Sequence, residues 1–284
     1  MSEIEVLRAG PMTTIQDLGR PGWMHVGVPP SGAADVGALD FGNRIVGNPP
    51  TAAALEATLA GPRLRFQAPA LVALTGAETN ATVAGRPAAA GTLLRLRAGD
   101  VLELHGCERG VRTYVCVRGG IEVEPSLGSC STDLLTGLGP APLRDGAVLR
   151  IGAEPPTPPQ LGLDPPPPRP NVPLLRVVPG PRDDWFVPGA LETLVANPWS
   201  VNAASNRVGI RLDGPHLERV DRGELLSEGL VTGAMQVPPS GQPILLLNDH
   251  PTTGGYPVLA VVCAADIAVA GQLGPGATVR FALA

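Results

Sequence analysis

The sequence contains no lysine, and all 21 of its basic residues are arginine. A phosphate-binding loop of the form Gly-x-x-x-x-Gly-Lys-Ser/Thr therefore cannot be present, and neither can a Schiff-base lysine or a biotin-carrying lysine. If ATP or biotin chemistry involves this chain, another chain or domain must supply those groups.

Cysteine and histidine are also scarce. No Cys-x-x-Cys pair is present, which excludes the usual zinc and thioredoxin motifs. The histidines show no metal-ligand spacing, so we predict no metal site. The residues concerned are Cys107, Cys116, Cys130 and Cys263, which we expect to be reduced thiols, and His25, His105, His216 and His250.

The formal net charge is only −5, and no basic cluster appears, which argues against a nucleic-acid surface. The first twenty residues hold no apolar run of signal-peptide length. The longest apolar stretch, residues 258–270, contains Asp266 and is too short to cross a bilayer. We therefore expect a cytoplasmic protein with no membrane contact, whose partners are small molecules or proteins.

Short apolar runs separated by glycine and proline predict a mainly β fold, either barrel or sandwich. Examples are LVALTGAE, VLELHG, TYVCVRGG, AVLRIG, LLRVVPG, GIRLDG, ILLLND and VLAVVC. Helical signals are few. Ser31 or Asp35 can cap a segment that ends at Gly47, and residues 188–196 are a second candidate.

Residues 155–170 contain nine prolines and cannot pair within a sheet. Such a segment favours extended polyproline geometry and predicts a semi-rigid linker, with a polyproline ligand for a partner as the alternative. We therefore predict two domains, residues 1–154 and 171–284.

The first cluster of candidate site residues lies in TTIQDLGRPG and GVPPSGAAD. The cluster offers polar groups on loops stiffened by glycine and proline, as binding residues often are, and these are Gln16, Asp17, Arg20, Ser31 and Asp35. The alternative is an Asp17–Arg20 ion pair that merely holds a turn.

The second cluster begins at RGGI, where the Gly119–Gly120 amides could approach an anion, although a hairpin turn explains the pair equally well. The third is ASNRVGIRLDG, in which Arg207 and Arg211 could clamp a carboxylate.

The fourth cluster is NDHPTTGGYP, residues 248–257, which holds more hydroxyl and ring groups than a turn needs. Asp249 and His250 are adjacent, so no Ser-His-Asp arrangement follows from them.

Taken together, these motifs resemble one family in order and in spacing, between Thr13 and Phe281. The motifs are TTIQDLGRPG, GVPPSGAAD, LEATLAGP, LTGAE, RGGI with LGSCST, SNRVGIRLDG, LLSEG, MQVPPSGQPI and TTGGYP. The family is carboxyltransferase-like, and its members are known as the C subunit of 5-oxoprolinase, as KipA or as allophanate hydrolase subunit 2.

The resemblance implies two cyclophilin-like β-barrel domains with a few short helices. It also implies a KipI-like partner, the B subunit, with or without an A subunit, in a complex that uses ATP to open 5-oxoproline to glutamate. The related module of urea carboxylase transfers a carboxyl group from biotin to urea. The absence of lysine fits this division, since no biotin can be attached to this chain.

From residue chemistry within these motifs, we expect a small carboxylate or amide substrate. Arg20 and Arg207 would hold its carboxylate. The oxyanion of a carbonyl group under attack would be stabilised in the last motif. The catalytic candidates are Thr252, Thr253, Gly254, Gly255 and Tyr256, and the substrate-binding candidates are Gln16, Asp17, Arg20, Ser31, Gly119, Gly120, Asn206, Arg207, Asp249 and His250.

The chain departs from the family pattern at three places. Asn206 stands where the family usually has Asp, Cys130 where it has Arg, and His250–Pro251 where it has Arg-Gln. Two other functions therefore stay open, a non-catalytic KipA-type module that sequesters a KipI-like protein, and a paralogue that stabilises its partner without catalysis.

Overall fold

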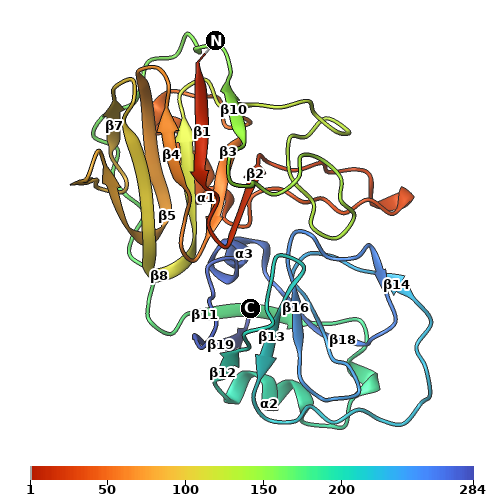
Figure 1. The fold of residues 1–284 in the computed structure, drawn as a ribbon. Coiled ribbons are helices and arrows are strands. Elements are labelled where there is room, and N and C mark those ends of the chain that lie inside the picture. Colours follow the sequence, from red (N-terminus) through yellow and green to blue (C-terminus); the bar gives the residue numbers. More distant parts are fainter. Residues whose placement is uncertain (1) are drawn as a thin grey trace. The chain divides into compact units, whose positions relative to one another are not determined.

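The computed structural model describes residues 2–284, which form two compact units, each with a barrel-like sheet of its own (Figure 1). The N-terminal unit comprises the residues up to Arg20, Ser31–Asp133 and Gly137–Pro168. The C-terminal unit comprises Pro21–Pro30, Leu134–Thr136 and Arg169–Ala284. The architecture is mainly β with short helices, which confirms the fold class predicted from the sequence.

The N-terminal unit is built on a ten-stranded sheet in the order β2-β3-β8-β4-β1-β10-β9, with β5 pairing β6, β7 and β8. Its strands are β1 (Glu3–Arg8), β2 (Met12–Gln16), β3 (Ala54–Thr58), β4 (Arg63–Phe66), β5 (Ala70–Val83), β6 (Arg86–Pro87), β7 (Leu93–Leu96), β8 (Val101–Val117), β9 (Ile121–Glu122) and β10 (Val148–Ile151).

Strand β8 joins two segments that the sequence predicted as separate strands, VLELHG and TYVCVRGG. The polar residues between them stay in the strand because β5 pairs with β8 from Val72–Val117 to Val83–Leu102. Three register shifts in this ladder accommodate the glycine-rich middle.

Helix α1 (Val36–Val46) confirms the first helix predicted from the sequence. Asp35, not Ser31, caps it by accepting a hydrogen bond from the amide of Ala38, and Gly47 ends it in the left-handed conformation. Its apolar face packs with Ala54, Ala73 and Cys116 of the sheet. The larger core of this unit contains Ile15, Leu55, Leu74 and Val115.

The C-terminal unit is a closed barrel in the order β11-β18-β15-β16-β13-β12-β19, in which the pairing of β11 with β19 is parallel. A separate two-stranded ribbon joins β14 to β17. The strands are β11 (Leu174–Pro179), β12 (Trp199–Val201), β13 (Gly209–Asp213), β14 (Glu228–Gly229), β15 (Ala234–Gln236), β16 (Ile244–Leu246), β17 (Thr253–Gly254), β18 (Val258–Val262) and β19 (Thr278–Leu283).

Short helices complete the chain. Helix α2 begins after Gly189, two residues later than the sequence predicted, and α3 was not predicted. Their bounds are α2 (Ala190–Ala196) and α3 (Ile267–Ala270), with 3-10 turns η1 (Met24–Val26), η2 (Asp183–Trp185) and η3 (Ala264–Asp266). Among residues 2–284, none of these helices has the length and hydrophobicity that a membrane span requires.

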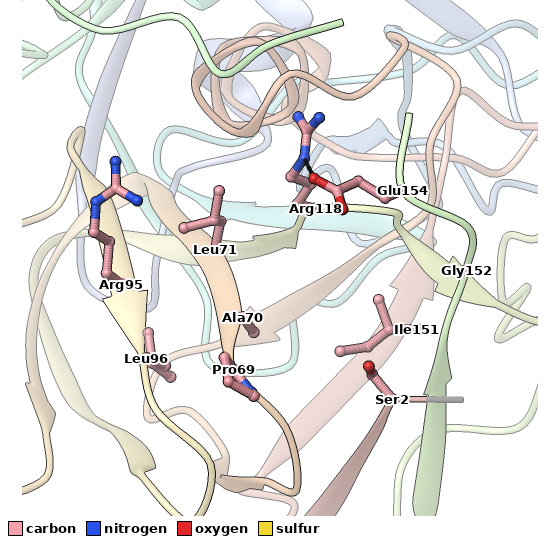
Figure 2. A pocket seen from close by; sticks show the side chains of 10 residues that line it. All are labelled: Ser2, Pro69, Ala70, Leu71, Arg95, Leu96, Arg118, Ile151, Gly152 and Glu154. Atoms are coloured by element: carbon pink, nitrogen blue, oxygen red, sulfur yellow. Dashed lines mark hydrogen bonds and ion pairs between the residues drawn. The ribbon is translucent and has the colours of Figure 1, made fainter. Parts of the chain in front are cut away.

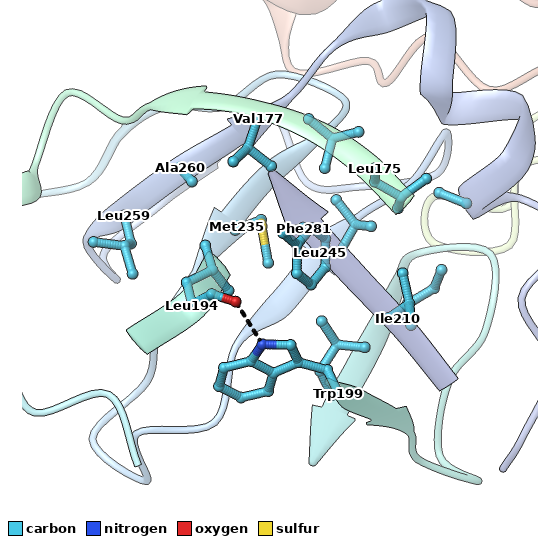
Figure 3. Packing of buried hydrophobic residues seen from close by; sticks show 14 of the residues in the cluster. Leu175, Val177, Leu194, Trp199, Ile210, Met235, Leu245, Leu259, Ala260 and Phe281 are labelled. Carbon is cyan, nitrogen blue, oxygen red and sulfur yellow. Dashed lines mark hydrogen bonds between the residues drawn. The ribbon is translucent and has the colours of Figure 1, made fainter. Parts of the chain in front are cut away.

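The barrel core of the C-terminal unit is a continuous set of buried side chains that includes Met235, Leu245 and Phe281 (Figure 3). Trp199 lies at its edge, and its indole Nε1 donates to the carbonyl of Leu194 at 2.9 Å. This bond satisfies the polar atom of a side chain that is otherwise fully buried.

The proline-rich segment begins against the N-terminal unit. We call residues 154–163 the strap. Arg118 donates to the Glu154 carboxylate and to the carbonyls of Pro155 and Thr157, and it also bonds the carbonyl of Val46 at the end of α1. The amide of Gln160 donates to the carbonyl of Ile45 at 3.2 Å.

Candidate functional site

Asp17 organises the first candidate cluster, within the N-terminal unit. Its carboxylate accepts hydrogen bonds from the hydroxyls of Ser129 and Ser131 at 2.6 and 2.5 Å, and from the amides of Gly19 and Cys130. The loop after β2 is thereby joined to the LGSCST segment. The sequence did not predict that these two motifs meet.

Arg20 belongs to the same network and is 1% exposed. Its guanidinium donates to the hydroxyl of Ser31 at 3.1 Å and to the carbonyls of Ser126 and Ser131. In the described part of the chain, no ion pair joins Arg20 to Asp17, so the alternative of a simple Asp17–Arg20 turn is not what forms. The guanidinium holds these loops together.

Gln16 lies beside this network, on a polar face of the sheet. Thr14 and Gln16 of β2 share this face with Glu56 of β3, because Thr14 is paired with Glu56 and side chains two residues apart point the same way. Glu56 is in turn paired with Tyr114 of β8, and all four side chains are at most 1% exposed.

The sequence motifs did not identify three residues of this face as candidates for the site, namely Glu56, Arg112 and Tyr114. The Tyr114 hydroxyl donates to Glu56 at 2.7 Å, the amide of Ala34 donates to the same carboxylate, and Arg112 lies 3.4 Å from it. The available signal was Glu56 within the short strand β3, and Arg112 and Tyr114 two residues apart in β8. It identifies a shared face only when the strand pairing is known.

Tyr114 stays protonated on this face. Burial, followed by the charges of Glu56 and Asp35, raises the pKa of its hydroxyl well above the ordinary value. The hydroxyl also accepts a hydrogen bond from the amide of Asp35 at 2.8 Å. Tyr114 therefore donates to Glu56 of the sheet and accepts from the residue that caps α1, which connects the two.

The Gly119–Gly120 pair forms a turn between β8 and β9, with both residues at positive φ. The amide of Gly119 donates to the Asn48 side chain, and that of Gly120 donates to the carbonyl of Val117, both at 2.8 Å. Both amides are used within the fold, and β8 and β9 do not pair with each other, so the turn is not the hairpin offered as the alternative.

A pocket of about 440 Å³ opens elsewhere in the N-terminal unit (Figure 2). Leu71 and Ile151 line it, and the paired side chains of Arg118 and Glu154 and the side chain of Arg95 stand at one end. None of the site residues predicted from the sequence lines this pocket, and Arg118 is engaged by the strap.

In the C-terminal unit, Arg207 forms a buried two-point ion pair with Asp249. The guanidinium Nε and one terminal nitrogen lie 3.0 and 3.1 Å from the two carboxylate oxygens, and the side chains are 3% and 0% exposed. The carboxylate that Arg207 binds here is thus part of the chain. Arg211, which was grouped with it in the sequence, is exposed on β13.

Asn206 is exposed and stabilises the turn before β13. Its carboxamide oxygen accepts from the amides of Val208 and Gly209 at 2.8 and 3.3 Å. Aspartate, the usual family residue, offers the same acceptor. The exchange therefore preserves this turn and removes one charge from an exposed position.

His250 follows the buried pair directly and is itself fully buried. Its Nδ1 lies 2.7 Å from the carbonyl of Pro251, so Nδ1 carries the proton in the neutral ring. Nε2 has no hydrogen-bond partner among residues 2–284. Burial lowers the pKa of the imidazole, opposed by the Pro251 carbonyl and by Asp249.

The Thr252–Tyr256 segment is displayed on the β14–β17 ribbon. Thr253 is paired with Gly229, and the carbonyl of Thr252 accepts the amide of Leu230 at 2.9 Å. Thr253 and Tyr256 are exposed, whereas Gln236 of β15 is buried beneath the ribbon and donates to the carbonyl of Tyr256 at 3.1 Å. The LLSEG, MQVPPSG and TTGGYP motifs therefore meet at this ribbon.

An ion pair anchors β14. The two carboxylate oxygens of Glu228 face the guanidinium of Arg182, which lowers the pKa of the glutamate. Glu228 consequently stays ionised and does not act as an acid at neutral pH. Within residues 2–284, no group of three or more His, Cys, Asp or Glu side chains is arranged to hold a metal ion.

Chemically, the two units offer different groups. The polar sheet face of the N-terminal unit holds one buried acceptor, Oε1 of Gln16, whereas the single O–H of Tyr114 is already donated to Glu56. The C-terminal unit supplies the neutral acceptor Nε2 of His250, and exposed hydroxyls at Thr253 and Tyr256. These acceptors and hydroxyls can form hydrogen bonds with the N–H and C=O groups of a substrate.

Comparison with known proteins gives consistent relatives over nearly the whole chain. The C subunit of 5-oxoprolinase from Escherichia coli (strain K12) is 39% identical over 286 residues, which cover 98% of this chain and 90% of that protein. Among solved structures, TTHA0988 superposes with a TM-score of 0.91 at 35% identity over 99% of this chain, which spans 55% of that chain.

The urea amidolyase of K. lactis superposes with a TM-score of 0.92 at 30% identity, and there the chain spans only 18% of the solved protein. Residues 26–283 match the family model described as carboxyltransferase domain, subdomain A and B. This match includes most of both units and begins after strands β1 and β2. The chain therefore belongs to the carboxyltransferase domain family that comprises subdomains A and B.

Proposed function

We propose that this chain is one subunit of an ATP-dependent hydrolase complex that acts on the C–N bond of a lactam or amide, of the 5-oxoprolinase or allophanate hydrolase type. The observation that carries the proposal is the similarity to the C subunit of 5-oxoprolinase, which extends over 90% of that protein. An alignment of this extent includes both units and every candidate motif.

The composition supports a division of labour between subunits. Without lysine the chain has no Walker A loop and no biotin attachment site, so ATP is used by another component of the complex. A KipI-like B subunit is the partner that we propose, and an A subunit is the further component. This chain then contributes substrate recognition and the stabilisation of charge.

The exposed ribbon is the proposed catalytic element. Thr252 and Thr253 supply hydroxyls, the glycines that follow keep the backbone accessible, and Gln236 holds the loop from below. Arg20 and Arg207 are positioning residues in this proposal, because the fold engages both guanidiniums.

The test is reconstitution of the chain with the A subunit plus the KipI-like B subunit. ATP-dependent formation of glutamate from 5-oxoproline, or of ammonia from allophanate, should require all the components, and omission of this chain should abolish it. Tight assembly without turnover of either substrate would contradict the enzymatic proposal and support the KipA-type binding module.

A further inference from the structure

The N-terminal unit carries a local surplus of positive charge. Residues 79–99 contain three arginines and no aspartate or glutamate, although the formal net charge of the chain is −5. Arg86 begins β6, Arg95 lies in β7, and Arg97 directly follows β7. All three are exposed to solvent. In an acidic protein, a cluster of this kind attracts anions to one part of the surface.

The fold places the three arginines around one pocket of about 500 Å³. Strand β5 ends in a tight turn at residues 84–85, both with positive φ, and strand pairing then holds Arg86 beside Val83. Arg95 is held in β7 by its pairing with β5. The wall of the pocket comes entirely from residues 83–100, and its volume is typical of a site for a small molecule.

The guanidiniums of these arginines are available to a ligand. No hydrogen bond or ion pair engages any of the three within residues 2–284. Arg95 also lines the pocket of Figure 2, where it stands apart from the ion pair of Arg118 and Glu154. Asp100 is the one acidic residue that lines the 500 Å³ pocket, and it accepts from the backbone amide of Arg97 at 2.7 Å. Three positive charges against one negative leave this pocket with a net positive charge.

The lining of the pocket indicates which anion it takes. A guanidinium binds the oxygens of phosphate through two parallel N–H donors, and a phosphate monoester presents nearly two negative charges and three terminal oxygens to several such groups at once. The pocket is larger than a phosphate group alone. Val83, Pro87 and Leu94 add apolar surface to its wall, and the carboxylate of Asp100 can accept a hydroxyl group. The complement is a phosphate joined to a small organic body.

We propose that the pocket lined by Arg86, Arg95 and Arg97 binds a small phosphate ester. The three guanidiniums hold the phosphate, and the organic part contacts the apolar wall at Val83 and Leu94. The proposal is independent of the proposed catalytic role, because none of the candidate site residues lines this pocket. The chain then has a ligand site in its N-terminal unit in addition to the ribbon of its C-terminal unit.

The experiment titrates the full chain with glycerol 3-phosphate and follows the backbone amide signals in 1H–15N NMR spectra. The signals of residues 83–100 should shift together and give one saturable dissociation constant. Arginine-to-glutamine substitution at any one of the three positions should weaken binding about tenfold, the value of one hydrogen bond between charged groups. Arg150→Gln makes the same charge change at an exposed arginine of β10 that does not line the pocket, and it should keep the wild-type affinity.

Ala89→Glu tests the pocket with all three arginines in place. Ala89 is exposed and lines the pocket, so the added carboxylate should compete with the ligand for the guanidiniums and weaken binding at least about tenfold. Inorganic phosphate and citrate should bind more weakly than glycerol 3-phosphate. No shift with glycerol 3-phosphate, or an unchanged affinity in all three arginine variants, would overturn the site. Equal affinity for inorganic phosphate or citrate would overturn its assignment to a phosphate ester.

Discussion

At the scale of single residues, the candidate positions differ in what the fold already demands of them. Asp17, Arg20, Arg207 and Asp249 have their charged groups engaged by neighbours within their own unit. Thr253 and Tyr256 are displayed instead. Substitutions at the first group should therefore change stability, and those at the second should change activity.

Thr253→Ala should reduce kcat of the reconstituted complex about tenfold to a thousandfold, if its hydroxyl stabilises charge in the transition state. Assembly and unfolding should be unaffected, because the side chain is exposed. Thr51→Ala, a change at an exposed threonine in a turn of the N-terminal unit, is the control. Unchanged turnover in Thr253→Ala would remove this residue from the catalytic proposal.

Asp249→Ala should lower the free energy of unfolding by about 3–5 kcal/mol, because it leaves the Arg207 charge buried without this partner. Asp184→Ala removes an exposed partner of Arg222, with side chains 53% and 45% exposed, and should cost at most about 1 kcal/mol. All three tryptophans lie in the C-terminal unit, so fluorescence during urea unfolding reports on it directly. Equal losses in the two variants would contradict this assignment.

His250 should make the C-terminal unit less stable in mild acid. Because burial lowers its pKa in the folded protein, the unfolded chain binds more protons once the pH falls below the unfolded value of about 6.5. Above this pH, His250 therefore does not lower the free energy of unfolding. As the pH falls toward the lowered pKa, the free energy of unfolding decreases. The carboxylates with lowered pKa values, Glu228 and Asp266, act at lower pH.

Urea unfolding at pH 7.5 and 5.5 measures this effect. The free energy of unfolding should be lower at pH 5.5 than at pH 7.5. This difference in free energy should shrink in His250→Gln, whose side chain does not titrate. It should persist in His105→Gln, a change at an exposed histidine. A pH dependence that survives in His250→Gln would assign the effect to another group.

At the scale of elements, the sequence predicted what local pattern determines. Asp35 and Gly47 delimit α1 because capping is local, and the runs LLRVVPG and VLAVVC became β11 and β18. The prediction of two separate strands in place of the long β8 was wrong, because pairing with β5 keeps the polar middle of β8 in the sheet. The polar face of Thr14, Gln16, Glu56 and Tyr114 required the register, which sequence spacing does not contain.

The ribbon can be tested by substitution of its glycines. A Cβ at Gly254 would lie 2.7 Å from Nε2 of Gln236 and 2.9 Å from Leu230, whereas a Cβ at Gly229 on the partner strand meets nothing within 4 Å. Gly254→Ala should therefore displace Gln236 and break its bond to Tyr256, at a cost of about 1–3 kcal/mol.

Hydrogen exchange at the amide of Leu230, which donates to Thr252, reports on the ribbon. Exchange should accelerate in Gly254→Ala and stay unchanged in Gly229→Ala. Equal exchange in the two variants would mean that Gln236 adapts to the extra methyl group without loss.

At the scale of the whole molecule, the sequence did not predict which distant motifs meet within each unit. Residues 17–20, Ser31 and residues 126–131 meet in one network of the N-terminal unit, and the motifs at residues 227–229, 236 and 252–256 meet at the ribbon of the C-terminal unit. Neither of these contacts between motifs can be predicted from the spacing of the motifs in the sequence. The proline content of residues 155–170 predicted an extended backbone. Because proline has no amide N–H, the carbonyl groups of this segment must bind donors from other parts of the chain.

Arg118 supplies those donors for the strap, and its loss should free the start of the connection. Arg118→Ala removes the bonds to Glu154, Pro155 and Thr157 and also exposes the carbonyl of Val46. The amide of Gln160, held by the end of α1, should then exchange with solvent deuterium at least about tenfold faster. Arg150→Ala, a change at an exposed arginine of β10, should leave this exchange unchanged. If Gln160 stays protected in Arg118→Ala, then packing of the strap on α1 holds it without Arg118, and the length of chain free to connect the units is set by proline geometry alone.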